Sequence, residues 1–352
     1  MQNKTIKPSL CCAIALMMCL NLHAEDPTGR VEPLSRIVFG SCIKQDLPTP
    51  IFHTMSVPTP ELLLFTGDNI YGDTDDMPTL RTKYNKLAAN PAFASLRNSS
   101  PVLATWDDHD YGVNDGGADF AKRDESQKEF LDFWGIPQQS PLRNRVGVYN
   151  AKMFGPVGQR TQVIMLDTRY FRSTLKTGDR RVGGPYVPDS EPTKTMLGDQ
   201  QWQWLKEQLQ QPADVRLIVS SIQFVASSAG QECWANFPLQ RQRMLDLIAS
   251  THAGGVLFIS GDRHWSEISA VTPDNGYSIV DVTCSSLNQI HARGTPTAND
   301  FRISETFHRE NFGVLTIDWQ NPDPSIHISI RDIEGTPRIK KNLRLSDLIF
   351  DN

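Results

Sequence analysis

Residues that can bind metal ions or move protons follow several short apolar runs of the sequence. Gly-Ser-Cys stands at 40–42, and Gly-Asp-Asn-Ile-Tyr stands at 67–71. Two more runs continue into Trp-Asp-Asp-His-Asp at 106–110 and Gly-Asp-Arg-His at 261–264. Thiolate, phenolate, carboxylate and imidazole groups offer soft and hard ligands together. This combination of residue types indicates a metal site.

Each motif alone has an ordinary structural explanation. A Gly-Asp pair after a strand often forms a turn, and a lone Cys there is often a small buried apolar residue. Residues 107–110 could be a solvated acidic loop, and residues 262–264 could be a surface salt-bridge cluster. The order of all four motifs within one domain-sized span favours a common site over four unrelated turns.

The apolar runs that precede these motifs predict the elements that position them. Ligands in α/β sheets sit beyond the carboxyl ends of the strands, where these motifs lie. Amphipathic helical runs separate the apolar runs, and this alternation predicts an α/β fold with helices covering the sheet faces. The predicted buried strands are 36–39, 62–65, 102–105, 163–166, 217–219 and 256–259.

The pattern changes after about residue 266, where only strands are expected. These strands, at 267–271, 278–283, 313–318 and 326–331, predict a second sheet that is mixed or antiparallel. Segments 172–195 and 285–310 are rich in Gly, Pro, Ser, Thr and charged residues. We expect them to be long loops that border a site.

Taken in order, the four motifs resemble those of the PhoD-type alkaline phosphatase (alkaline phosphatase D) family of the metallophosphatase superfamily, over roughly residues 36–335. The resemblance implies an α/β fold built as a two-sheet β-sandwich flanked by helices, in four αββα layers. It also implies Fe(III) and Ca(II) at the sheet edges, with other divalent metals left open. Because the first motif starts at residue 40, we expect a single catalytic domain over 25–352, without the N-terminal β-domain of larger relatives.

The resemblance implies an iron ligand set that agrees with ligand chemistry. Asp68 is expected to bridge the two metals, because a carboxylate has one oxygen for each ion. Cys42, Tyr71 and His264 are expected to complete the iron site. A trivalent ion keeps thiolate and phenolate deprotonated near neutral pH.

The second ion is expected to be bound mainly by oxygen. Asp108 stands where related metallophosphatases place an Asn ligand, and Asp262 is a further ligand. Carboxylate oxygens suit Ca(II). Asn114 is a weaker candidate, and Gln223 stands at a position that is His in relatives, which leaves one ligand of this ion open.

The expected reaction is phosphoester hydrolysis, in which a water acidified by the metals attacks phosphorus in line. His109 is expected to donate to a phosphoryl oxygen or to protonate the leaving alkoxide. Arg169, or else Arg172, could clamp phosphate as a fork, and Arg169 could equally be a structural partner of a carboxylate. Monoester hydrolysis is favoured, and a phosphodiesterase or phospholipase-like activity stays open because the metal ligands do not set leaving-group size.

Two other classes of function remain as alternatives. One is an extracellular metal-binding protein without turnover. The other is a thiol-based reaction at Cys42, which would need a positioned His base and would compete with metal binding. Loss of activity on iron removal separates the phosphoester hydrolase from the thiol enzyme.

The N-terminal residues predict export. Lys4 and Lys7 precede an apolar run at 10–22, and Ala24 precedes the first acidic residue, Glu25. This order is typical of a secretory signal peptide, here 1–24. The run is shorter than a membrane span requires. We therefore expect a periplasmic or secreted protein with no transmembrane segment in its mature chain.

Cysteine count and charge limit the partners. The mature chain keeps three cysteines, so at least one is free, metal-bound or intermolecular, and Cys233 could pair with Cys284. The formal net charge of −5 gives no basic surface for nucleic acid. The expected partner is a small phosphoester substrate.

Overall fold

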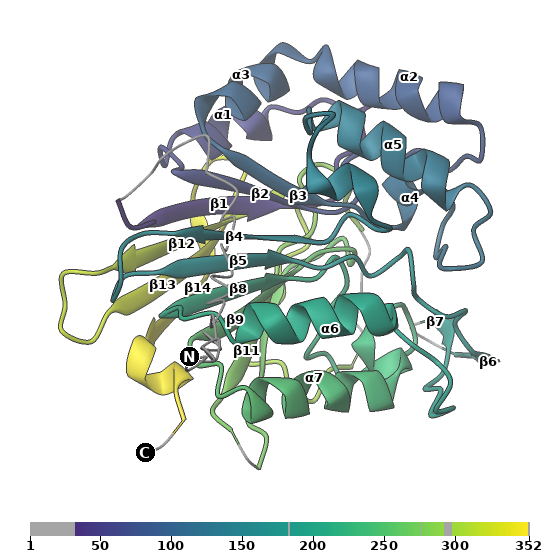
Figure 1. Cartoon of the computed structure of the whole chain (residues 1–352). Coiled ribbons are helices and arrows are strands. Elements are labelled where there is room, and N and C mark those ends of the chain that lie inside the picture. Colours follow the sequence, from purple (N-terminus) through teal and green to yellow (C-terminus); the bar gives the residue numbers. More distant parts are fainter. Residues whose placement is uncertain (1–31, 182–183, 275, 292–297, 351–352) are drawn as a thin grey trace, which may run out of the picture. The chain divides into compact units, whose positions relative to one another are not determined.

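The computed structural model describes residues 32–181, 184–274, 276–291 and 298–350, so the expected signal peptide at 1–24 lies outside the described residues. Their main feature is a pair of six-stranded sheets, drawn in Figure 1. In spatial order, the first sheet contains β14 (Pro337–Arg344), β13 (Ser325–Asp332), β12 (Asn311–Asp318), β1 (Arg36–Gly40), β2 (Leu62–Thr66) and β3 (Val102–Thr105). The second contains β10 (Glu267–Val271), β11 (Ile279–Thr283), β9 (Val256–Ser260), β8 (Val215–Val219), β5 (Thr161–Met165) and β4 (Asn150–Phe154).

Helices cover the outer face of each sheet (Figure 1). Those over the first sheet are α1 (Ile51–Ser56), α2 (Met77–Ala88), α3 (Pro91–Ser99), the short α4 (Asp108–Tyr111) and α5 (Arg123–Phe133). Those over the second are α6 (Gly198–Leu209) and α7 (Pro238–Ser250). Short 3₁₀ turns lie at Pro141–Asn144, Trp234–Asn236 and Leu345–Leu348. The predicted α/β sandwich with helices on both sides is confirmed.

The alternation of side chains along β2 explains the layers. Leu62 and Leu64 join the apolar core between the sheets, whereas Leu63 and Phe65 join the core beneath α1–α3 and α5. Successive residues of a strand point to opposite faces, so a strand buried on both sides is apolar throughout. The continuous run Leu-Leu-Leu-Phe is therefore the expected sequence of a strand between two layers.

The parallel strands direct their carboxyl ends to one region. In the first sheet, β1 pairs with β2 and β2 with β3 in parallel. In the second sheet, β5, β8, β9 and β11 are parallel neighbours. The turns that follow these strands carry the four sequence motifs, so the pairing brings the motifs to one side of the sandwich.

Two sequence predictions about the sheets were wrong in part. The C-terminal strands do not form a sheet of their own: β10 and β11 extend the second sheet, whereas β12 pairs antiparallel with β1 and brings β13 and β14 into the first. Local sequence indicates a strand but not the edge that it joins. Segment 172–195 is also not all loop, because it contains the hairpin of β6 (Thr177–Arg181) and β7 (Gly184–Tyr186).

No helix among the described residues has the length and apolar character needed to cross a membrane.

Candidate metal centre

The turns after the strands hold several side chains in an uncommon backbone conformation. Cys42, Asp68, Asp262 and His264 have φ values of 62°, 50°, 70° and 58°. Left-handed φ values are uncommon for residues other than Gly and cost about 1–3 kcal/mol each. Such strained residues concentrate at functional sites. Each of these turns therefore gives up backbone stability to point a ligand-competent side chain into the same region.

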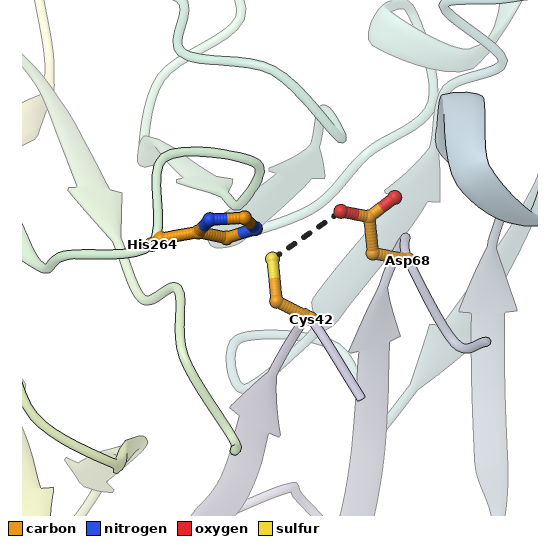
Figure 2. A group of neighbouring side chains, drawn as sticks. All are labelled: Cys42, Asp68 and His264. Atoms are coloured by element: carbon orange, nitrogen blue, oxygen red, sulfur yellow. Dashed lines mark hydrogen bonds between the residues drawn. The ribbon is translucent and has the colours of Figure 1, made fainter. Parts of the chain in front are cut away.

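Cys42, Asp68 and His264 form the first cluster, with one ligand atom of each within 4.8 Å of the others (Figure 2). Sγ of Cys42 lies 3.4 Å from Oδ2 of Asp68. The hydroxyl of Tyr71 lies 3.3 Å from the same oxygen and 2.6 Å from Nε2 of His264. The four residues expected to bind iron thus converge. Ser285 supports them, because its hydroxyl lies 3.1 Å from Sγ of Cys42 and accepts a hydrogen bond from the backbone N–H of His264.

A second cluster contains only carboxylates. Ligand oxygens of Asp68, Asp107, Asp108 and Asp262 lie within 4.8 Å of one another. Asp68 belongs to both clusters, which is the position required of a bridging ligand. Asp107 also belongs to this cluster, although the motif did not identify it as a ligand beside its neighbour Asp108.

The electrostatics of both clusters require a compensating positive charge. Burial, followed by the charge of Asp108, raises the pKa of Asp68 well above its usual range. Burial, followed by the charge of Asp107, does the same to Asp262. Oδ1 of Asp68 and Oδ1 of Asp108 are buried and accept no hydrogen bond. Buried carboxylates are stabilised by pairing or by metal coordination, so this donor set fits cations.

The soft side of the centre shows the same requirement. Burial and the charge of Asp68 raise the pKa of the Cys42 thiol, and burial and Cys42 raise the pKa of Tyr71. Burial, with His291 nearby, lowers the pKa of His264 to about 3. His264 is therefore a neutral imidazole at pH 7, the form that binds metals. A metal ion would supply the charge that thiolate and phenolate need to persist here.

Asp110 connects the turns of β2 and β3. Its Oδ1 accepts from the backbone N–H of Asp68 (3.1 Å) and of Asp107 (2.7 Å), and its Oδ2 accepts from the Asn69 side chain (2.6 Å). Its carboxylate therefore joins the turn after β2, which carries Asp68, to the turn after β3, which carries Asp107 and Asp108. Local sequence gives no role to Asp110, because its hydrogen bonds to Asp68 and Asn69 join it to a turn that is distant in the chain.

His109 lies beside the clusters and is positioned by Asp73. Nδ1 of His109 is 2.6 Å from Oδ1 of Asp73, and its ring centroid is 4.2 Å from that of Tyr71. Burial lowers the pKa of His109, but the hydrogen bond to Asp73 and the charge of Asp108 outweigh it and raise the pKa to about 9. The imidazole is thus held protonated at neutral pH. Asp73 was not selected from sequence, although it ends the same turn as Tyr71.

Arg169 is surrounded by carboxylates. Its side chain has no exposed surface; Nε donates to Oδ1 of Asp107 at 2.6 Å, and Nη1 donates to Glu232 at 2.5 Å. Arg172 lies on the other side of Glu232, with Nε 2.8 Å from Oε1. Of the two roles considered for Arg169, a phosphate clamp and a structural partner of a carboxylate, these contacts favour the second. Glu232 was missed, because it follows no strand and stands in no motif.

The remaining sequence candidates have different surroundings. Asn114 lines the cavity beside Asp108 and Asp262. Gln223 instead lies in the core, where its amide donates to Glu267 and Thr283, both at 2.9 Å. Gln223 is therefore a hydrogen-bonded core residue and is not part of either ligand cluster.

The cysteine pairing considered from sequence is not present. Cys233 and Cys284 are both buried free thiols. Sγ of Cys233 donates to the Ser228 carbonyl at 3.0 Å, and Sγ of Cys284 donates to Asn311 at 3.3 Å. Each thiol therefore has its own hydrogen-bond partner in a different part of the core. The odd number of cysteines showed only that at least one is not paired within the chain, not which one.

A cavity of about 230 Å³ gives access to the ligand clusters. Its lining combines the predicted ligands Asp108, Asp262 and His264 with His109 and with residues of β7. Imidazole groups and carboxylates therefore face the same cavity. A small anionic ligand together with metal ions would balance these charges.

The two-sheet sandwich and the paired ligand clusters at its strand ends define the class of metallophosphatase-like proteins. Within that class, the chain belongs to the PhoD-like phosphatase family, which matches residues 38–316. The resemblance seen in the sequence motifs is thereby confirmed.

Individual relatives agree with this family. The chain is 26% identical over 234 residues to Alkaline phosphatase D of Bacillus subtilis (strain 168), a match that covers 59% of this chain and 39% of that protein. A solved structure of PhoD superposes with a TM-score of 0.65 at 16% identity, covering 91% of this chain and 73% of the other. GAP50, the anchor in the inner membrane complex of Plasmodium, has a TM-score of 0.56 at 13% identity, covering 91% and 90%. The two structural likenesses show the fold alone.

Proposed function

We propose that this chain is an exported, metal-dependent phosphoester hydrolase that favours monoesters. The observation that carries the proposal is that two buried ligand clusters share Asp68, and that His264 of one cluster and Asp108 and Asp262 of the other line the same cavity. Two-metal sites of this kind clamp the attacking and leaving oxygens of a displacement at phosphorus. Membership of the PhoD-like phosphatase family supports the same reaction.

The proposed metals follow from the donor types. Cys42, Tyr71, His264 and Asp68 would hold Fe(III), and Asp68, Asp108 and Asp262 would hold Ca(II), with Asn114 at the cavity as a further oxygen ligand. When bound, the ions supply positive charge for the phosphoryl oxygens and lower the pKa of water. The soft and hard donors belong to different clusters that share Asp68: one contains the Cys42 thiol, and the other contains only carboxylates.

His109 is the proposed proton donor. Asp73 engages its Nδ1, so Nε2 is the nitrogen that is left to donate toward a phosphoryl or leaving-group oxygen. In the metal-free protein, the hydrogen bond to Asp73 and the charge of Asp108 raise the pKa of His109 to about 9, which favours a protonated imidazole. We assign Arg169 no substrate contact, because Asp107 and Glu232 engage its guanidinium.

The proposal extends to the organisation of the chain. We propose that residues 1–24 direct export and that 25–352 form one catalytic domain that acts in the periplasm or outside the cell. Expression of the full chain, followed by N-terminal sequencing of the exported protein, tests this part. A mature protein starting near residue 25 supports it, and retention of the leader contradicts it.

The activity is tested by turnover of p-nitrophenyl phosphate and bis(p-nitrophenyl) phosphate across pH, with metal analysis of the same sample. We expect turnover of the monoester that is lost on chelation and in Asp68→Asn. Asp246→Asn, at an exposed position on α7, is the matched control. Fully metal-loaded protein that turns over neither ester would favour the non-catalytic metal-binding alternative. Activity that survives iron removal would favour a thiol reaction at Cys42.

A further inference from the structure

The hairpin of β6 and β7 forms one wall of the cavity, through Gly184, Pro185 and Tyr186. Its backbone is docked against the loop before α7, because the Tyr186 N–H donates to the Gly230 carbonyl at 3.1 Å. Gly184 has φ +126°, and a Cβ there would stand 2.0 Å from that same carbonyl oxygen. This close backbone approach fixes the position of the wall, and a larger residue at 184 would push it away.

Tyr186 is joined to the candidate metal centre by two successive hydrogen bonds. Its hydroxyl donates to Oδ2 of Asp115 at 2.5 Å. The backbone N–H of Asp115 donates to Oδ2 of Asp108, a proposed metal ligand, at 2.7 Å. Asp115 itself has a left-handed φ of 54°. The half-buried phenol ring is therefore held at the cavity wall, close to the proposed ligand Asp108.

The cavity is small for a substrate with two arms. Its volume of about 230 Å³ lies below the ~300–1,000 Å³ typical of pockets that enclose drug-sized ligands. A phosphomonoester has one organic arm, whereas a phosphodiester has two. The hairpin lies on one side of this cavity, and His264 and His291 also line it, so we expect room for one bulky arm rather than two.

We propose that Tyr186 is a specificity-determining residue whose ring closes the cavity against a second ester arm and so restricts the site to phosphomonoesters. This inference rests on the proposed phosphoester hydrolase activity and names its substrate class. Rejection by a steric clash is an effective source of specificity, because it weakens binding of the wrong ligand without strengthening binding of the right one.

The test compares wild type, Tyr186→Ala and Tyr186→Phe as purified, metal-loaded proteins. Phenylphosphonate represents the monoester and diphenylphosphinate the diester, since their C–P bonds resist hydrolysis, and calorimetry gives both dissociation constants. We expect wild type to prefer phenylphosphonate and Tyr186→Ala to reduce that preference about tenfold or more. Tyr186→Phe keeps the ring and should keep the preference. The ratio of kcat/KM for the bis and mono p-nitrophenyl esters should change in parallel.

The outcomes separate this inference from the proposed function. Wild type that binds both probes equally, or Tyr186→Ala that keeps the wild-type preference, overturns the role of Tyr186 even if the monoester is hydrolysed. Wild type that hydrolyses neither ester overturns the proposed function, while the two binding constants still decide whether Tyr186 discriminates. Inorganic phosphate binding and metal content check that each variant retains its centre. If Tyr186→Ala does not fold, Pro185→Gly opens the same wall at an exposed position and should shift the preference in the same direction.

Discussion

The backbone N–H of Asp68 donates to Oδ1 of Asp110 at 3.1 Å, so a carboxylate from the β3 turn supports the strained β2 turn. The same oxygen accepts from the Asp107 N–H at 2.7 Å. Asp68 is the residue common to both ligand clusters. Its placement therefore depends on a side chain that contacts no proposed substrate and belongs to a different strand end.

Replacement of Asp110 by Ala should loosen both acidic turns. It removes the acceptor of two buried backbone N–H groups, and a buried donor without a partner costs about 1–3 kcal/mol. We expect the free energy of unfolding to fall by about 2–4 kcal/mol and the bound metal per chain to fall with it. Denaturant unfolding and elemental analysis measure both. Asp246→Ala, on the exposed face of α7, should change neither by a comparable amount. Full metal content in Asp110→Ala would contradict the supporting role.

Replacement of Cys42 by Ser should remove the soft ligand with little change in volume. Ser presents a hydroxyl that is a poor ligand for iron in place of a thiolate, so we expect iron content to fall. Any visible absorption from thiolate or phenolate bound to iron should be lost as well. Cys233→Ser is the matched control, because Cys233 is an equally buried free thiol whose hydrogen bond to the Ser228 carbonyl a hydroxyl can replace. Cys42→Ser with full iron occupancy would remove Cys42 from the ligand set.

Most of the centre could be predicted from sequence because its residues directly follow apolar strands. Cys42, Asp68 and Asp262 each stand two residues past the last residue of β1, β2 and β9. The carboxyl ends of parallel strands meet at one edge of each sheet, and the ligand clusters join residues from these edges of both sheets. Local sequence was therefore enough to select them, together with Tyr71 and His264 in the same turns.

The supporting residues could not be predicted in the same way. Glu232 lies in a loop before α7 and acquires its role only because Arg169, which follows β5, and Arg172 fold against it. Asp110 and Asp73 act through hydrogen bonds to other turns. The division of the C-terminal strands between the sheets depends likewise on the long-range pairing of β12 with β1. Each of these contacts joins segments that are distant in the chain, so local pattern carries no signal for them.

The metal-free protein should become less stable as the pH rises. In the metal-free protein, burial raises the pKa of Asp68 and Asp262 above their unfolded values and raises that of Asp107 to about 8 despite the opposing charge of Arg169. A raised folded-state pKa gives a contribution that is complete below the unfolded pKa of about 4 and is lost as pH rises through the folded pKa. We expect chelation to lower the Tm more at pH 8 than at pH 5.

Thermal unfolding of loaded and chelated protein at both pH values measures this difference. Metal binding should be tighter at the higher pH, because the ligands must release protons to bind. A chelation effect that is equal at pH 5 and pH 8 would show that the buried carboxylates are already ionised without metal. The same measurements on Asp68→Asn should give a smaller difference between the effects of chelation on the Tm at pH 5 and pH 8, because one carboxyl group with a raised pKa is then absent.

Replacement of His109 by Ala should slow turnover while the metals stay bound. His109 faces the cavity, Asp73 engages its Nδ1, and one ring nitrogen of His109 lies within 4.8 Å of carboxylate oxygens of Asp68 and Asp108. A positioned proton donor contributes about 10²–10⁴-fold to the rate, so we expect a loss of kcat of that size on p-nitrophenyl phosphate with unchanged metal content. Asp73→Asn should give a smaller loss, because the imidazole remains but is oriented and charged less well. His53→Ala, at an exposed position on α1, should have wild-type kcat. Unchanged turnover in His109→Ala would show that the proton comes from another group.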